Sequence, residues 1–60
     1  MNLTFILEQL SDLYDETEAQ AWILSPQQRL DGQVPAELIE VNRGDEVLAV
    51  IRQLRDGVHL

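Results

Sequence analysis

The sequence predicts an all-α fold, a small bundle of about four helices with a loop rich in Pro and Gly in the middle. Two longer segments with helical spacing, 3–14 and 45–56, lie towards the ends, and two shorter ones, 16–24 and 35–42, flank the loop. No segment alternates apolar and polar residues as a β-strand does. Sixty residues allow one domain at most, with a core so small that its stability is marginal.

The first helix is predicted from apolar residues that recur every three or four positions. Glu8, Asp12 and Glu16 fall on the opposite face, and Phe5 points away from the apolar stripe. The stripe consists of Leu3, Ile6, Leu7, Leu10, Leu13 and Tyr14.

The second helix is predicted from a capping box, in which Asp15 caps the first turn and Glu18 returns the hydrogen bond. It must end by residue 25, because the residue before Pro26 is pushed out of the α region. In the loop that follows, Asp31-Gly32 is a strong turn signal. Pro35 suits the first turn of the third helix, where its missing N–H costs nothing.

The last helix is predicted to begin after a break at 42–44, with Asp45 and Glu46 in its first turn, where negative charge suits the helix dipole. Gly57 is expected as a left-handed cap at its C-terminal end, so that 57–60 form a short tail. The apolar stripe of this helix is Val47, Val50, Ile51 and Leu54.

The charge of the chain is strongly acidic. Eleven Asp and Glu residues oppose four Arg, and the net charge is −7. Such a surface repels phosphate backbones, so we expect no nucleic-acid binding by this chain alone. It favours a basic protein partner, although acidity could equally serve solubility. With no apolar run long enough to span a membrane and no signal peptide, the sequence predicts a cytoplasmic protein without a membrane role.

Catalytic chemistry is not predicted. The chain has one His, His59, and no Cys, and it lacks metal-ligand clusters and a glycine-rich phosphate loop. The tripeptide Arg43-Gly44-Asp45 is better explained as a helix break and the start of the next helix than as an adhesion motif. We therefore expect a binding module rather than an enzyme, with no cofactor and no metal.

One ordered string of residues is more specific than the helical pattern. Trp22 and Pro26, then Leu30, Gly32 and Pro35, follow the spacing W-L-x-x-P-x-x-x-L-x-G-x-x-P. The string continues with Glu37-Leu38-Ile39, Gly44, Val47 and Asp56-Gly57-Val58. In order and spacing, from about residue 10 to residue 60, it resembles the toxin-binding domain of the Xre/MbcA/ParS-type antitoxins.

The resemblance implies one toxin-binding domain over 1–60, the antitoxin of a bacterial type II toxin–antitoxin system. Its partner would be a RES-domain toxin, which depletes NAD in the cytoplasm, and the C-terminal end of the antitoxin would lie at or in the toxin's active-site cleft. Carried over by position, the toxin-binding residues are Arg52, Arg55, Asp56, Gly57, Val58, His59 and Leu60.

The sequence departs from the family pattern in three respects. Val34 stands where Ser or Thr often caps the third helix, and His59 replaces the more usual aromatic residue. A helix-turn-helix domain usually precedes this region in the family, and we expect none here. The alternative function is therefore a structural self-association module, the remnant of a transcription regulator without its DNA-binding domain, and homo-oligomers remain open.

Overall fold

Four α-helices make up most of the described part of the chain. The computed structural model describes residues 2–58, and among these there is no β-strand, which confirms the predicted all-α class. A single 3-10 turn, η1, lies in the Pro/Gly loop and was not predicted. The elements are α1 (Leu3–Leu10), α2 (Glu16–Ile23), η1 (Gln28–Leu30), α3 (Pro35–Glu40) and α4 (Gly44–Val58).

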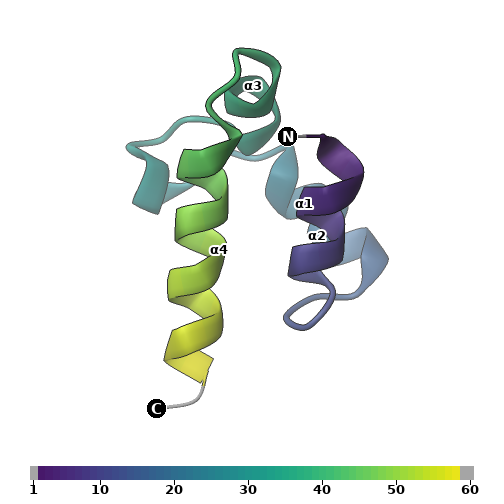
Figure 1. Cartoon of the computed structure of the whole chain (residues 1–60). Helices are drawn as coiled ribbons and strands as arrows, with labels where there is room; N and C mark the ends of the chain where they lie inside the picture. Colours follow the sequence, from purple (N-terminus) through teal and green to yellow (C-terminus); the bar gives the residue numbers. More distant parts are fainter. Residues whose placement is uncertain (1, 59–60) are drawn as a thin grey trace.

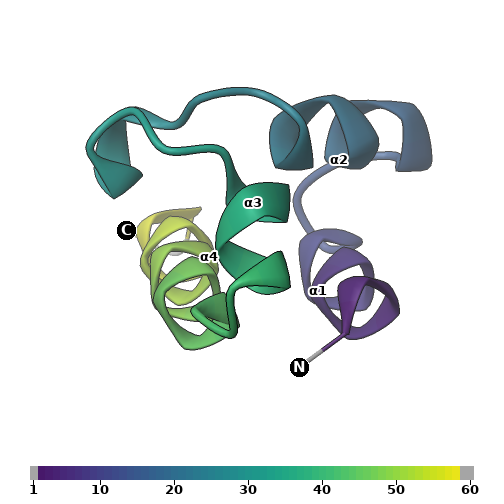
Figure 2. The same cartoon turned by 90° about the horizontal axis from the view of Figure 1, so that it is seen from above.

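The helices are arranged around α4, the longest of them (Figure 1). Helix α4 contacts α3, α1 and η1, and α2 contacts α1 and α3. Seen from above, α3 lies between α4 on one side and the pair of α1 and α2 on the other (Figure 2). The loop that contains η1 runs across from α2 to the α4 side and returns to start α3. The C-terminal turns of α4 extend beyond the neighbouring elements in Figure 1.

The core draws one or more residues from every helix and from η1. Ile6, Val47 and Ile51 are fully buried. The expected stripe on α1 is therefore largely confirmed, but Leu3, the first residue of the helix, is 45% exposed. Phe5 is 40% exposed and points away from the core, as predicted. The buried set is Ile6, Leu10, Ala19, Ile23, Leu30, Leu38, Val47, Val50 and Ile51.

Helix α1 ends four residues earlier than the predicted range 3–14. At Ser11 the hydroxyl donates a 2.6 Å hydrogen bond to the carbonyl oxygen of Glu8, which competes with continuation of the helix. The amides of Leu13 and Tyr14 then both turn back to the carbonyl of Leu10, at 2.9 and 3.0 Å. The chain is reversed by these bonds, so that Asp15 can begin α2 beside α1.

Helix α2 begins with the predicted capping box. The Asp15 carboxylate accepts from the amide of Glu18 at 2.8 Å, and the Glu18 carboxylate accepts from the amide of Asp15 at 3.3 Å. After the helix ends, Asp31 and Gly32 take φ angles of 57° and 81°, which reverse the chain as the sequence predicted. The amide of Gln27 meets the carbonyl of Gln33 across this turn at 3.1 Å.

The third helix begins at the predicted proline and ends before the predicted break at 42–44. Pro35 is at the start of α3 and is buried, and Val34 caps that helix without a side-chain hydrogen bond. Asn42 ends α3 in a left-handed conformation with φ of 63°. The amide of Arg43 then bonds to the carbonyl of Leu38 at 2.8 Å, which satisfies one of the free carbonyls at the end of α3.

Candidate protein-binding surface

The last two turns of α4 carry the described part of the site predicted from the sequence. Arg52 and Asp56 lie one turn apart on the exposed face of the helix, since residues four apart share a face. The opposite face of α4 is anchored in the core by Val47, Val50 and Ile51. The exposed face is thus presented on a helix that the sequence predicted over 45–56.

The predicted tail is helical where the structure describes it. Helix α4 continues through Gly57 to Val58, and Gly57 does not have a positive φ, so the expectation of a left-handed cap at Gly57 was wrong. The sequence pattern could not reveal this, because Gly is tolerated in the last turn of a helix as well as just beyond it. His59 and Leu60, the other two residues of the predicted tail, lie outside the described residues.

Arg55 differs from Arg52 in having partners on α1. Its Nη1 donates to Oε1 of Gln9 at 3.1 Å, and its Nη2 lies 3.2 Å from Oδ2 of Asp12. The Arg55 side chain is therefore held against α1 and only partly exposed. Among the residues that the structure describes, Arg52 has no ion pair, and its guanidinium is on the exposed face.

A hollow beside α4 was not predicted. It has a volume of about 250 Å³ and lies where α4 meets η1 and the end of α2. On one side of it, Arg29 donates from Nη1 to Oε1 of Gln53 on α4 at 3.2 Å. Trp22 is half-buried, and it lines this hollow while it also packs on the core. The lining is Tyr14, Trp22, Gln27, Gln28, Arg29, Val50 and Leu54.

The charges are unevenly distributed over the fold. The first 28 residues contain five acidic residues and no Arg or Lys. Three of the four Arg side chains, those of residues 29, 52 and 55, lie on or against the C-terminal half of α4. Positive side chains near the C-terminal end of a helix are also favoured by its dipole. The C-terminal half of α4 is therefore the basic region of an otherwise acidic protein.

The fourth arginine stabilises the start of α4. Arg43 and Glu46 form a two-point pair, in which Nε donates to Oε2 and Nη2 donates to Oε1 at 2.8 Å. The hydrogen bond from Arg43 lowers the pKa of the Glu46 carboxyl below its ordinary value, and the same bond raises the pKa of Arg43. Both side chains are close to half exposed, so the pair is a surface feature that fixes the first turn.

Taken together, a rigid exposed helix end, a neighbouring hollow and a local basic region define a small helical binding domain. No group of three or more acidic or His side chains within residues 2–58 is placed to hold a metal ion. None of the helices in this described part is long and apolar enough to cross a bilayer.

The comparison with protein families identifies which binding domain this is. The model of the antitoxin Xre/MbcA/ParS C-terminal toxin-binding domain matches residues 9–57, which is most of the chain. The chain belongs to this family, as its sequence pattern predicted. The matched region includes α2, η1, α3 and nearly all of α4, but only the end of α1. The comparisons with curated proteins and with solved structures found no significant match.

Proposed function

We propose that this chain is the antitoxin of a bacterial type II toxin–antitoxin system and that it neutralises a RES-domain toxin in the cytoplasm. Membership of the antitoxin toxin-binding family is the observation that carries the proposal, and it implies a toxin as partner. The RES class of the toxin, and its depletion of NAD, follow from the resemblance described above. We expect the chain itself to have no catalytic activity.

The proposed contact surface is the exposed face of α4 with the residues that follow it. Arg52 and Asp56 are accessible on that face, and Gly57 is exposed beside them. The end of α4 extends past the rest of the fold in Figure 1, a shape that could enter a cleft without a clash from α1 or α2. Arg side chains are enriched at protein interfaces, and the active site of an NAD-consuming enzyme must attract an anionic dinucleotide. The carboxylates of this chain, such as Asp56, would suit a site of that kind.

Arg55 has a second role in this proposal. Because its guanidinium already bonds to Gln9 and Asp12, it would contribute to toxin binding mainly by holding α4 in place. Arg52 would make the direct contact. His59 and Leu60 complete the proposed blocking element, and Val58, the last residue of α4, precedes them in the sequence.

The test is co-expression with a RES-domain toxin, with growth and cellular NAD as readouts, and a gene for such a toxin adjacent to the gene for this chain would supply the first candidate. We expect the full chain to form a complex, restore growth and preserve NAD. Arg52→Ala should weaken the complex. Arg43→Ala is the control, because it also removes an arginine side chain but at the opposite end of α4, and it should leave the complex unchanged. A full chain that neither binds the toxin nor protects cells would overturn the proposal.

A truncation after Asp56 separates binding from blocking. If the end of α4 and the residues after it block the cleft, the truncated chain should still bind through α4 but should no longer preserve NAD. Equal protection by the truncated chain would refute the blocking mechanism and leave the binding role intact. Growth arrest without loss of NAD would assign the toxin to another class.

The alternative of a structural self-association module stays a prediction. The measurement that addresses it is the mass of the isolated chain in solution by light scattering. A stable oligomer that also fails to bind the toxin would favour it over the antitoxin proposal.

A further inference from the structure

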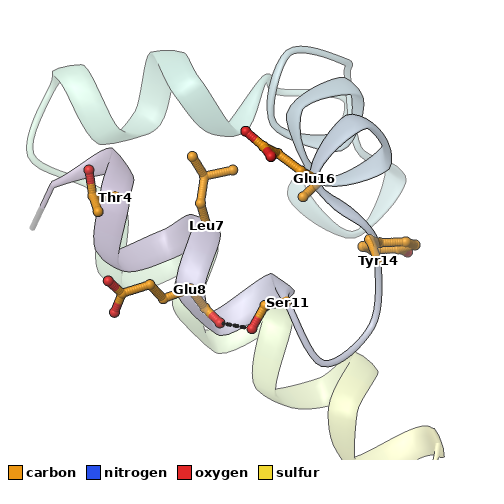
Figure 3. A pocket seen from close by; sticks show the side chains of 7 residues that line it. Thr4, Leu7, Glu8, Ser11, Tyr14 and Glu16 are labelled. Atoms are coloured by element: carbon orange, nitrogen blue, oxygen red, sulfur yellow. Dashed lines mark hydrogen bonds between the residues drawn. The ribbon is translucent and has the colours of Figure 1, made fainter.

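A groove between α1 and α2 is not used by the proposed blocking mechanism. It consists of two adjoining hollows, of about 300 and about 190 Å³, that share Leu7 as a lining residue. Figure 3 shows Leu7 pointing from α1 towards the opening between the helices. At one end of the groove Leu3 and Leu24 are 45% and 69% exposed, although both are large apolar side chains. Most of the surface of the groove is apolar.

The lining residues have the spacing that receives another helix. On each of α1 and α2 they recur every three or four positions, so each helix contributes one continuous stripe. Two such stripes side by side form the kind of groove into which a third, amphipathic helix packs. Each helix has eight residues, about 12 Å in length, which corresponds to two to three turns of a ligand helix. The stripes are 3, 4, 7, 8 and 11 on α1 and 16, 19, 20, 23 and 24 on α2.

The charge of the groove selects the ligand. Glu8 and Glu16 line the larger hollow, one from each helix. Glu16 follows the turn between the helices, whereas the Glu8 carboxylate points away from that turn, towards the side of Thr4 (Figure 3). No Arg or Lys occurs in α1 or α2 to neutralise them, and Asp15 and Glu18 lie at the start of α2. A second copy of this chain carries the same net charge of −7, which opposes its approach, and one of the two arginines on its α4, Arg55, is already paired with Asp12. A basic segment would be attracted, and attraction of this kind speeds association and selects the partner.

Most of the α1 side of the groove lies outside the part of the chain that matches the family model. The match to the family model begins at residue 9, whereas most of the α1 side of the groove, including Leu3, Leu7 and Glu8, precedes that residue. Arg52 and Asp56, the proposed toxin contacts on α4, do not line it. Both surfaces could therefore be occupied in the same molecule.

We infer that the α1–α2 groove is a second docking site, which binds a basic amphipathic helix of a protein partner. Apolar side chains at i, i+4 and i+7 of that helix would cover Leu3, Leu7 and Leu24. Arg or Lys side chains on it would pair with Glu8 and Glu16. The inference does not depend on the class of the toxin, because it rests on a different face of the protein.

The test uses a synthetic amphipathic peptide of about 14 residues, with Leu at i, i+4 and i+7 and Arg at the flanking positions. Binding is measured by fluorescence anisotropy, and the site is located by amide chemical shifts in NMR spectra of the full chain. We expect shifts confined to α1, α2 and the turn between them. A peptide with Glu in place of each Arg should not bind.

Two pairs of matched variants test the groove itself. Leu24→Arg places a charge in the groove and should weaken peptide binding at least about fivefold, as expected for loss of an apolar anchor. Val41→Arg is its control, because Val41 is 63% exposed and also follows the last residue of a helix, but lies outside the groove. Both side chains are exposed, so neither variant should unfold the protein, and the NMR spectra will report this directly.

The second pair reverses the charge at the groove and away from it. Glu8→Arg with Glu16→Arg should also weaken binding at least about fivefold. Glu40→Arg with Glu37→Arg changes the net charge by the same amount on α3, where Glu37 is in the first turn as Glu16 is in α2, and should leave binding nearly unchanged. Shifts spread over the whole surface, or equal losses in both pairs, would overturn the inference. A dimer of the free chain that Leu24→Arg dissociates would also overturn it, because the groove would then hold a second copy.

Discussion

Arg55 on α4 and Asp12 after α1 form an ion pair with 3.2 Å between Nη2 and Oδ2, across 43 positions of the sequence. A second bond from the same guanidinium reaches Gln9 at 3.1 Å. These contacts fix the C-terminal half of α4 against α1, at the place where the proposed toxin contacts begin. Two arginines that the sequence placed together in one site thus have different environments, because one is tied to α1 and the other is exposed.

Replacing each arginine with Met should separate stability from binding. Arg55→Met removes an ion pair and a hydrogen bond at the surface, and we expect it to lower the free energy of unfolding by about 0.5–1 kcal/mol. Arg52→Met removes an exposed side chain and should change that free energy by less than about 0.5 kcal/mol. Urea denaturation followed by circular dichroism measures both. For affinity to the toxin we expect the opposite ranking. Arg52→Met should weaken the complex more than Arg55→Met does.

A double-mutant cycle checks whether Arg55 acts through Asp12. Asp12→Asn alone should destabilise the protein, and adding it to Arg55→Met should cost little more, since the pair is already broken. Additive losses would show that the two side chains do not interact in solution.

Removal of the cap at the start of α2 should destabilise the protein. Asp15→Ala leaves the amide of Glu18 without its acceptor, so we expect a loss of about 1 kcal/mol in the free energy of unfolding. Asp15→Asn keeps an acceptor oxygen at the same position and should retain most of the stability. For a domain of this size, a loss of about 1 kcal/mol corresponds to a decrease of roughly 4–8 °C in Tm, which a thermal scan resolves. Equal effects of Ala and Asn would attribute the loss to charge instead of to capping.

The pair between Arg43 and Glu46 should make stability depend on pH in the acidic range. Because the folded-state pKa of Glu46 is lowered by the hydrogen bond from Arg43, its contribution to stability is present above the unfolded-state pKa. That contribution is lost as the pH falls through the folded-state pKa. The Tm of the natural chain should therefore exceed that of Glu46→Gln at neutral pH. The difference should shrink as the pH falls below the ordinary Glu pKa of about 4.3 and vanish only below the lowered folded-state pKa. Glu40→Gln is the control, and a difference that persists at low pH would contradict the assignment.

The elements that the sequence predicted well are those whose ends carry local chemistry. The Asp15 cap, the turn at Asp31-Gly32 and the start of α3 at Pro35 each depend on a few neighbouring residues, and each is confirmed. The end of α1 was missed because Leu13 and Tyr14 continue the apolar spacing of the helix. In the structure they reach a half-buried position through a turn instead, so periodicity could not distinguish the two cases.

The candidate surface could be predicted only in part for a related reason. The pattern located the residues of α4, but the partners of Arg55 lie more than forty positions earlier, and nothing in the local sequence indicates them. The hollow that Tyr14 and Trp22 line likewise needs α1 to stop and η1 to form beside α4. Such features depend on tertiary packing, which overrides local propensity.

The substitution Gly57→Ala tests how α4 ends. In the structure Gly57 is helical, and a Cβ added there meets no atom within 4 Å, so Gly57→Ala should stabilise the protein by up to about 1 kcal/mol. The gain arises because Ala has less freedom than Gly to lose on folding. Gly32 also has open space around it, but its φ of +81° is unfavourable for Ala, so Gly32→Ala should destabilise the protein by roughly 1 kcal/mol. Chemical denaturation of both variants compares their free energies of unfolding. Equal losses of stability in the two variants would mean that Gly57 is a left-handed cap. Val58 would then belong to a tail rather than to α4.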